Sequence, residues 1–178
     1  MNHTKTIGIV GCGTMGTGIA IVAARAGFKT HIYDLRPEPL ENARKQAAAF
    51  LKKSVERGKL AAGEDALIMS QFLTTTEIRD FADCDLVIEA VFEDLKVKHS
   101  IFKQLNEVCH AETIFASNTS TISITEIAGG CGRADRFVGM HFCLPAQLMK
   151  LVEMSPGMNT SEATFDKAWK LCEDMGQR

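Results

Sequence analysis

The sequence predicts an α/β fold in which a doubly wound, mostly parallel sheet carries helices on both faces. Two observations predict it. Short apolar runs typical of buried strands alternate with segments whose apolar residues recur at helical spacing, and the first apolar run leads directly into a glycine-rich turn. The 178 residues contain no internal repeat and no Pro/Gly/Ser-rich linker. We therefore expect one domain over residues 1–178.

The composition is typical of a soluble globular protein and argues against several function classes. With 20 basic and 22 acidic residues, the formal net charge is −2, whereas nucleic-acid-binding proteins normally show a basic excess. No apolar run reaches the roughly 18 residues of a membrane span, and the first residues do not resemble a signal peptide. Six cysteines stand at irregular spacing without a C-x-x-C pair. We expect reduced thiols, no metal site, no nucleic-acid or membrane partner, and a cytoplasmic protein.

A strand–helix–strand unit begins the predicted sheet. Residues 6–10 form a short apolar run typical of a strand buried on both faces. The turn 11–16 follows, and apolar residues then recur at helical spacing until Gly27, which ends the helix. Residues 29–33 predict the second strand, which ends on Asp34. Such a βαβ unit is right-handed in nearly all proteins.

A long helix rich in basic residues is predicted over 39–59. We interpret its charges as a solvated helix face, and the alternative is that they hold an anionic substrate. A second helix is predicted over 64–71 and a short strand over 72–76.

The second half of the chain continues the alternation of strands and helices. The apolar runs predict four more strands, and helical spacing predicts a helix with its apolar positions between 97 and 108 and a final helix over 161–175. The four strands are expected at 85–89, 113–116, 136–142 and 149–154.

The turn has the pattern G-x-G-x-x-G between a strand and a helix, which is the context that gives this motif meaning. Gly11 permits the tight turn, Gly13 lets the backbone approach a pyrophosphate, and Gly16 lets helix and strand pack closely. The free N–H groups at the start of the helix, where Thr14 and Met15 stand, then face the phosphates. The pattern predicts a Rossmann-type, dinucleotide-binding fold.

Asp34 predicts which dinucleotide binds. It ends the second strand, where a carboxylate accepts hydrogen bonds from the hydroxyls of the adenosine ribose. Because a carboxylate also repels a 2′-phosphate, NAD is favoured over NADP, a preference that Arg36 tempers without reversing. If the glycines served only a tight turn, Asp34 would be left unexplained.

The chain resembles the NAD-binding domain of the L-3-hydroxyacyl-CoA dehydrogenases, including the 3-hydroxybutyryl-CoA type. The matching stretches follow the family's order over nearly the whole chain. They are the glycine-rich segment 8–16, Glu-Ala-Val-Phe-Glu-Asp-Leu-Lys-Val-Lys at 89–98, Phe-Ala-Ser-Asn-Thr-Ser at 115–120, Arg-Phe-Val-Gly-Met-His-Phe at 136–142 and Met-Lys-Leu-Val-Glu at 149–153.

The resemblance implies a catalytic pair in which His141 is the base and Glu153 is its partner. Histidine suits this role because its unperturbed pKa lies near neutrality, and a neighbouring carboxylate fixes the tautomer and stabilises the imidazolium. Two adjacent strands joined by the loop 143–148 would bring the pair together. Without the flanking motif, His141 would be interpreted as an ordinary half-buried histidine at a strand end.

The resemblance also implies that Ser120 donates a hydrogen bond to the substrate oxygen beside the nicotinamide. Ser120 would thus contact both cofactor and substrate, and Asn118 would shape the turn next to the substrate. The alternative for Ser120 is a helix N-cap, a position that serine favours.

Further cofactor contacts are implied by the same match. Glu93 and Lys98 resemble the family's pair on the nicotinamide-ribose side, and Met15, Val91 and Phe92 would supply backbone or apolar contacts to NAD. The alternative for Glu93 and Lys98 is a pair of surface charges that contributes little.

The activity implied is NAD-dependent oxidation of L-3-hydroxyacyl-CoA to 3-oxoacyl-CoA, or the reverse reduction, as in fatty-acid metabolism and β-oxidation. Acyl-CoA would be the substrate, with the basic helix as a candidate contact for CoA. We expect the chain to lack the family's C-terminal helical dimerisation domain, so that it is incomplete for turnover and monomeric by itself.

Leu144 departs from the family, which has asparagine in the pattern His-Phe-Phe-Asn-Pro. Residues 146–148 depart from the family pattern as well. Two alternatives therefore stay open: a catalytically silent NAD-binding relative, and a dehydrogenase of another 3-hydroxy acid.

Overall fold

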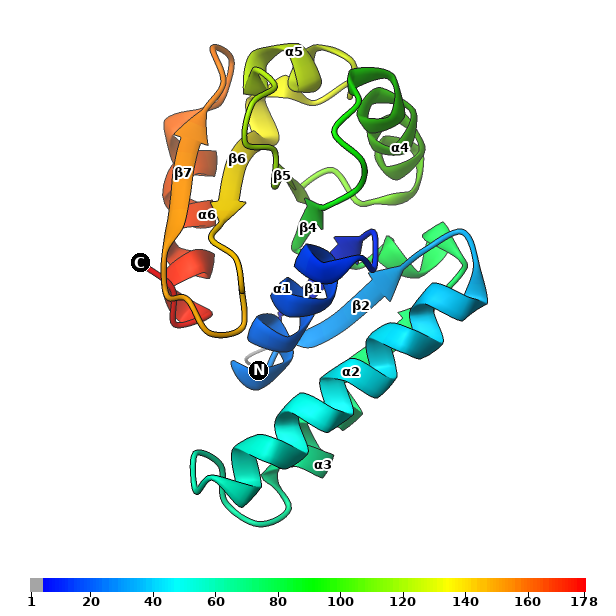
Figure 1. Cartoon of the computed structure of the whole chain (residues 1–178). Helices are drawn as coiled ribbons and strands as arrows, with labels where there is room; N and C mark the ends of the chain where they lie inside the picture. The colour runs from blue at the N-terminus through cyan, green and yellow to red at the C-terminus, as the bar shows by residue number, and fades with distance from the viewer. Residues whose placement is uncertain (1–4) are drawn as a thin grey trace.

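The computed structural model describes residues 5–178, which form a seven-stranded sheet of order β3-β2-β1-β4-β5-β6-β7 (Figure 1). Strands β1 to β6 are parallel, and β7 pairs antiparallel with β6. The predicted doubly wound, mostly parallel sheet is therefore confirmed. The strands are β1 (Thr6–Val10), β2 (Lys29–Tyr33), β3 (Phe72–Thr75), β4 (Leu86–Glu89), β5 (Ile114–Ser117), β6 (Phe137–Phe142) and β7 (Val152–Pro156).

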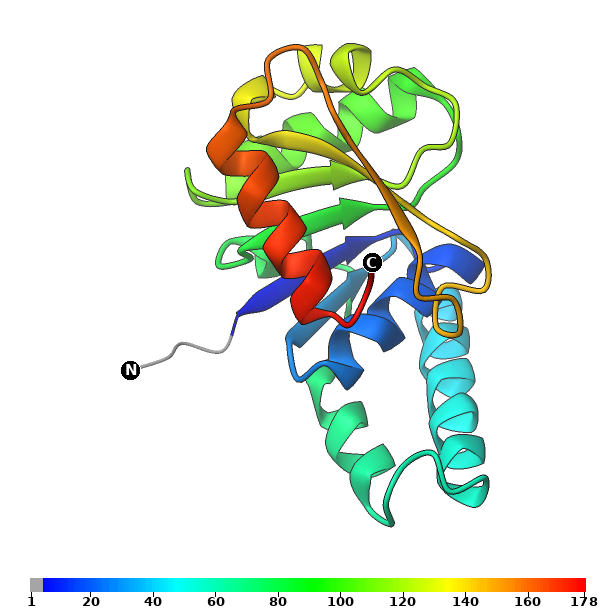
Figure 2. The same ribbon diagram turned by 90° about the vertical axis from the view of Figure 1, so that its left-hand side faces the viewer.

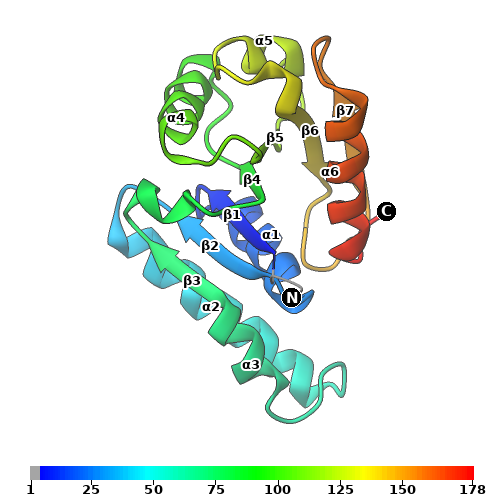
Figure 3. The same cartoon turned by 180° about the vertical axis from the view of Figure 1, so that it is seen from behind.

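Helices cover both faces of the sheet. The buried residues of α1, α2, α3 and α6 pack in one hydrophobic cluster with the sheet, and those of α4 and α5 pack in a second cluster. Helix α6 lies across one face (Figure 2), and β3 with α2 and α3 stands at the opposite end of the sheet from β7 (Figure 3). The helices are α1 (Thr14–Arg25), α2 (Pro37–Glu56), α3 (Glu64–Gln71), α4 (Leu95–Val108), α5 (Ile124–Gly129) and α6 (Glu162–Asp174).

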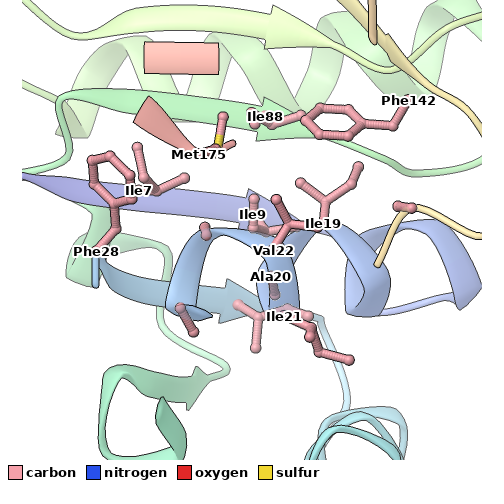
Figure 4. Packing of buried hydrophobic residues seen from close by; sticks show 14 of the residues in the cluster. Ile7, Ile9, Ile19, Ala20, Ile21, Val22, Phe28, Ile88, Phe142 and Met175 are labelled. Carbon is pink, nitrogen blue, oxygen red and sulfur yellow. The ribbon is translucent and has the colours of Figure 1, made fainter. Parts of the chain in front are cut away.

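Strand β1 lies in the middle of the core, and all five of its residues are buried. Ile7 and Ile9 belong to the same hydrophobic cluster as Ile19 and Val22 of α1, and Figure 4 shows Ile9 next to these two residues of the helix. Close packing of α1 on β1 places the N-terminus of this helix at the carboxyl end of the central strand. No helix within residues 5–178 is long and apolar enough to cross a membrane.

The strand order reverses between β1 and β4. From β1 the chain moves outward to β2 and β3, and it then returns to the other side of β1 and moves outward through β4, β5 and β6. Ligands of such sheets bind at this reversal, in the crevice beyond the carboxyl ends of the strands. Gly11, Asp34, Ala90 and Asn118 follow these ends directly.

The boundaries of several predicted elements were wrong. Helix α2 begins at Pro37 rather than at residue 39, because proline fits the first helical position, where no N–H is needed. The last strand begins at Val152 rather than at Met149, because Leu148 N and Met149 N both donate to the Pro145 carbonyl (3.0 and 2.9 Å) and form a turn. The short helix α5 was not predicted at all.

Candidate cofactor-binding and catalytic site

The glycine-rich turn lies at the carboxyl end of β1 and uses its glycines for different reasons. Gly11 has φ = +93°, a left-handed conformation that glycine favours, and its N–H donates to the Tyr33 carbonyl (2.8 Å). At Gly16 a Cβ atom would lie 1.8 Å from the Gly11 carbonyl oxygen, so only glycine lets α1 approach the turn. At Gly13 a Cβ atom would meet no atom within 4 Å. Open space therefore lies beside the backbone where a pyrophosphate would approach.

The first turn of α1 is available to an anion. Its N-cap residue is Gly13, and no side chain caps the helix within the described part of the chain. The N–H groups of Thr14 and Met15 therefore have no intrahelical partner. Thr17 instead stabilises the turn from inside, because its hydroxyl donates to the Cys12 carbonyl (3.0 Å). An uncapped helix start after a glycine turn fits the pyrophosphate of a dinucleotide.

Asp34 lies beside this turn at the end of β2. Its Oδ2 accepts from the Cys12 backbone N–H (3.4 Å) and the Cys12 thiol (3.2 Å), and its Oδ1 accepts from Arg36 N (3.4 Å). Burial, together with the hydrogen bond to Asp34 and its charge, raises the pKa of the Cys12 thiol to about 12. The thiol therefore stays protonated and donates, which holds the carboxylate at the edge of the turn.

A buried ion cluster lies at the carboxyl end of β4. The side chain of Lys98 is 1% exposed, and its Nζ lies 2.8 and 2.9 Å from the two carboxylate oxygens of Glu89 and 3.1 Å from Glu93 Oε2. Glu89 also accepts from Ser117 Oγ (2.6 Å) and from Val91 N (2.7 Å). Lys98 is therefore not a surface charge, as the alternative assumed, whereas the side chain of Glu93 is 40% exposed.

Glu93 extends from this cluster toward the crevice. Its Oε1 accepts hydrogen bonds from the hydroxyls of Thr119 and Thr121, the latter at 3.1 Å. Burial by itself would raise the pKa of Glu93, but the hydrogen bonds from Thr119 and Lys98 and the charge of Lys98 lower it to about 2. Glu93 is therefore a carboxylate at any physiological pH.

The loop after β5 is tied to both of its neighbouring strands. Asn118 N donates to the Glu89 carbonyl (2.8 Å), and Asn118 Oδ1 accepts from Phe142 N (2.8 Å). Ser120 is exposed on this loop. The N-cap of α5 is Ser123, whose side chain accepts from Glu126 N, so the alternative role of Ser120 as a helix cap was wrong.

His141 and Glu153 face each other across β6 and β7. They are direct partners in the antiparallel register, and His141 Nδ1 lies 2.7 Å from Glu153 Oε2. The His141 side chain is 34% exposed, which leaves it partly open to the crevice. The predicted juxtaposition is confirmed, and its cause is strand pairing.

The predicted apolar contacts for the cofactor lie around this edge. Val91 and Met15 are half-buried, and Met15 packs against the core. Phe92 is 86% exposed on the loop after β4. Their roles toward a cofactor stay predictions.

Sequence reasoning missed Glu89 and Ser117, which are both fully buried in the cluster. The sequence places Glu89 at the end of a strand and at the start of the matching stretch 89–98, but it predicts no role for its side chain. A carboxylate that ends a buried strand, with a lysine a few residues into the next helix, was the signal that could have found it, because a buried charge needs a partner.

The fold and this edge of the sheet define the class: a dinucleotide-binding domain of the dehydrogenase type. Residues 6–178 match the family described as 3-hydroxyacyl-CoA dehydrogenase, NAD binding domain. The chain belongs to this family, which confirms both the resemblance and NAD as the cofactor.

Individual relatives agree with this assignment. The chain is 41% identical over 170 residues to a probable 3-hydroxybutyryl-CoA dehydrogenase of Deinococcus radiodurans, covering 96% of this chain and 61% of the relative. It is 40% identical to the 3-hydroxyadipyl-CoA dehydrogenase of Escherichia coli K12, covering 100% of this chain and 38% of that protein. The crystal structure of 3-hydroxybutyryl-CoA dehydrogenase from E. coli K12 superposes with a TM-score of 0.96 at 40% identity, over 99% of this chain and 37% of the other. The chain thus spans less than two thirds of the length of each of these proteins.

Proposed function

We propose that this chain is the cofactor-binding part of an enzyme that oxidises L-3-hydroxyacyl-CoA to 3-oxoacyl-CoA with NAD, or carries out the reverse reduction. The observation that carries the proposal is the His141–Glu153 pair, at 2.7 Å, on the same edge of the sheet as the glycine turn and Asp34. Oxidation of a secondary alcohol requires a base and a hydride acceptor at one place, and this edge brings together the residues for both.

In this proposal His141 Nε2 takes the proton of the substrate hydroxyl. Glu153 holds Nδ1 of the same ring, which fixes the tautomer and stabilises the imidazolium that forms. Ser120 donates to the substrate oxygen, and Asn118 fixes the distance between this loop and His141 through its bond to Phe142 N. Bound NAD supplies the hydride acceptor.

The substrate class is supported by a surface cavity of about 490 Å³ between α1, α2 and the loop before β7. Gln177 lines it, and its Oε1 is a buried oxygen without a hydrogen-bond partner among residues 5–178. Asp174, the acidic residue of the lining, is paired with Lys5 and Lys170. Phosphates of CoA would meet the cations of this lining. The basic lining residues are Arg25, Lys53, Arg57, Lys59 and Lys150.

The cofactor half of the proposal is tested by titrating the chain with NADH. We expect saturable binding that Asp34→Asn weakens at least tenfold, because the ribose hydroxyls lose a charged acceptor. Asp83→Asn is the matched control. This exposed carboxylate precedes β4 and thus lies at the amino ends of the strands, away from the carboxyl ends where Asp34 lies. Equal NADH affinity of the wild type and Asp34→Asn would contradict the proposal.

The catalytic half is tested by acetoacetyl-CoA reduction in this chain extended by the C-terminal region of a relative. His141→Gln should abolish turnover and leave NADH binding within twofold, because His141 acts on the substrate. Arg57→Ala should raise KM for acetoacetyl-CoA and leave KM for free acetoacetate unchanged, if the cavity holds CoA.

A catalytically silent NAD-binding protein is the second candidate. Leu144, in the loop after His141, has a side chain that is 63% exposed where the family has an amide, and this observation favours it. NADH binding without any reduction of acetoacetyl-CoA by the extended chain would establish it. Reduction of a 3-oxo acid that lacks CoA would instead favour a dehydrogenase of another 3-hydroxy acid.

The same proposal includes the metabolic process and the cellular compartment. We place the protein in the turnover of acyl-CoA thioesters, as in β-oxidation, and in the cytoplasm. All six cysteines are free thiols, the state typical of a reducing compartment. We propose that the complete protein dimerises, whereas this chain alone is a monomer.

A further inference from the structure

The buried cluster at the end of β4 does not balance its own charge. Glu89 and Glu93 each bring a carboxylate, and Lys98 brings the single ammonium that both of them contact. Because Lys98 and Glu89 are almost completely buried, solvent screens these two charges little. One negative charge is therefore left over, and it lies on Glu93, whose side chain is 40% exposed.

Both carboxylates are ionised, as their hydrogen bonds show. Each oxygen of Glu89 accepts from two donors: Oε1 from Lys98 and Val91 N, and Oε2 from Lys98 and Ser117. Ser117 Oγ also accepts from Thr119 N. The ammonium of Lys98, which can only donate, lies against both oxygens of Glu89, as expected for a carboxylate. The pKa of Glu93, lowered to about 2 by its hydrogen bonds and by Lys98, indicates a carboxylate as well.

The position of the cluster follows from the topology. In a doubly wound sheet the dinucleotide crosses the strand reversal, with one mononucleotide on each side of it. Asp34 and the glycine turn occupy the side of β1 and β2, so the nicotinamide half lies over β4 and β5. Glu89 ends β4, and Ser117 ends β5 beside it in the register. The leftover negative charge of the protein would therefore lie beside the nicotinamide half of the bound cofactor.

We infer that the Glu89–Lys98–Glu93 cluster raises the affinity of the site for NAD⁺ relative to NADH, because the nicotinamide ring is positively charged only in the oxidised cofactor. The inference rests on the proposed function for NAD binding and extends it to selection between the two redox states. The adenosine half is identical in the two forms, so contacts of Asp34 and the glycine turn cancel in the ratio of their affinities. That ratio isolates the ring charge.

The experiment is calorimetric titration of the chain with NAD⁺ and with NADH. We expect Glu93→Gln to lower the ratio of NAD⁺ affinity to NADH affinity by about fivefold. This is the effect of one partly screened charge at a separation of several ångströms. Glu93→Asp keeps the charge and should keep the ratio. Glu112→Gln is a matched control, because Glu112 is an exposed glutamate paired with Arg136 at the opposite end of β5.

A second variant avoids changing the buried cluster. Thr121 is exposed and its hydroxyl lies 3.1 Å from Glu93, so Thr121→Lys adds a cation beside the leftover charge. It should shift the ratio in the same direction as Glu93→Gln, whereas the neutral Thr121→Gln should not. An unchanged ratio in Thr121→Lys, with both cofactors still bound, overturns the inference alone. Failure of the wild type to bind either cofactor overturns the proposed function as well.

Discussion

Two Gly→Ala substitutions three residues apart should act on different properties of this domain. Gly16→Ala places a Cβ atom 1.8 Å from the Gly11 carbonyl oxygen. Ordinary contact needs about 3.5 Å, so the helix and the turn must separate by about 1.7 Å. Overpacking of this kind costs about 1–3 kcal/mol, and a backbone neighbour that cannot rotate away takes the cost to the upper end.

The net loss of stability in Gly16→Ala is smaller than the clash alone. Alanine in place of glycine in a helix recovers up to about 1 kcal/mol. The free energy of unfolding should therefore fall by about 2 kcal/mol, with Tm lower by about 6 °C for a domain of this size.

Gly13→Ala should leave stability unchanged and impair binding. Its Cβ atom meets nothing within 4 Å, and the residue has φ = −66°, which alanine adopts freely. The weaker N-cap costs about 0.5–1 kcal/mol, and the stiffer unfolded chain offsets about 0.4–1 kcal/mol. The new methyl group occupies the space beside the helix start, so NADH affinity should fall at least tenfold, or about 1.4 kcal/mol.

The assay is urea unfolding of both variants, paired with NADH titration. Stability of Gly16→Ala equal to that of the wild type would refute the packing argument. A loss of stability in Gly13→Ala as large as its loss of binding energy would refute the separation of roles.

Three further outcomes are expected. Arg133→Ala should lower the free energy of unfolding, measured in urea, by about 2–4 kcal/mol and leave NADH affinity unchanged. Arg133 donates to backbone carbonyls between residues 106 and 113, and its guanidinium lies 4.5 Å from the centre of the Phe115 ring. Cys12→Ala should weaken NADH binding about threefold by freeing the Asp34 carboxylate, and Cys12→Ser should restore it. Because the folded pKa of Glu93 is about 2 and the ordinary value is 4.5, its contribution to stability is complete above pH 4.5 and disappears as the pH falls toward 2. The stability difference between the wild type and Glu93→Gln should shrink over that interval in acid-unfolding measurements.

Most of the sheet was predictable because its strands are buried on both faces. Such strands appear as uninterrupted apolar runs, and β1 and β2 were placed to the residue. The exposed edges were less predictable. Met149 and Leu151 extend the apolar run before Val152, yet these residues are 43% and 48% exposed and lie in the connection that follows a turn. Helix α5 is too short, at six residues, to show a periodicity.

The residues of the candidate site also fall into those that the sequence predicts and those that it does not. The glycine turn and Asp34 carry their own local pattern, and the His141–Glu153 pair came from the family resemblance. Glu89 and Ser117 were missed because their importance depends on strand pairing, which places residues far apart in sequence side by side. The burial of Lys98 was missed for a related reason: a lysine on an amphipathic helix is normally exposed, and only its two carboxylate partners make burial favourable.

The register between β6 and β7 alone places His141 next to Glu153. The loop that connects the two strands does not contribute to this pairing. Side chains alternate between faces along a strand, so a shift of one residue between β6 and β7 would turn the two residues to opposite faces. Exposed positions of this loop, Leu144 among them, can therefore change without separating His141 from Glu153 as long as the ladder is kept. Ala146 is the exception, because it is buried in the hydrophobic core.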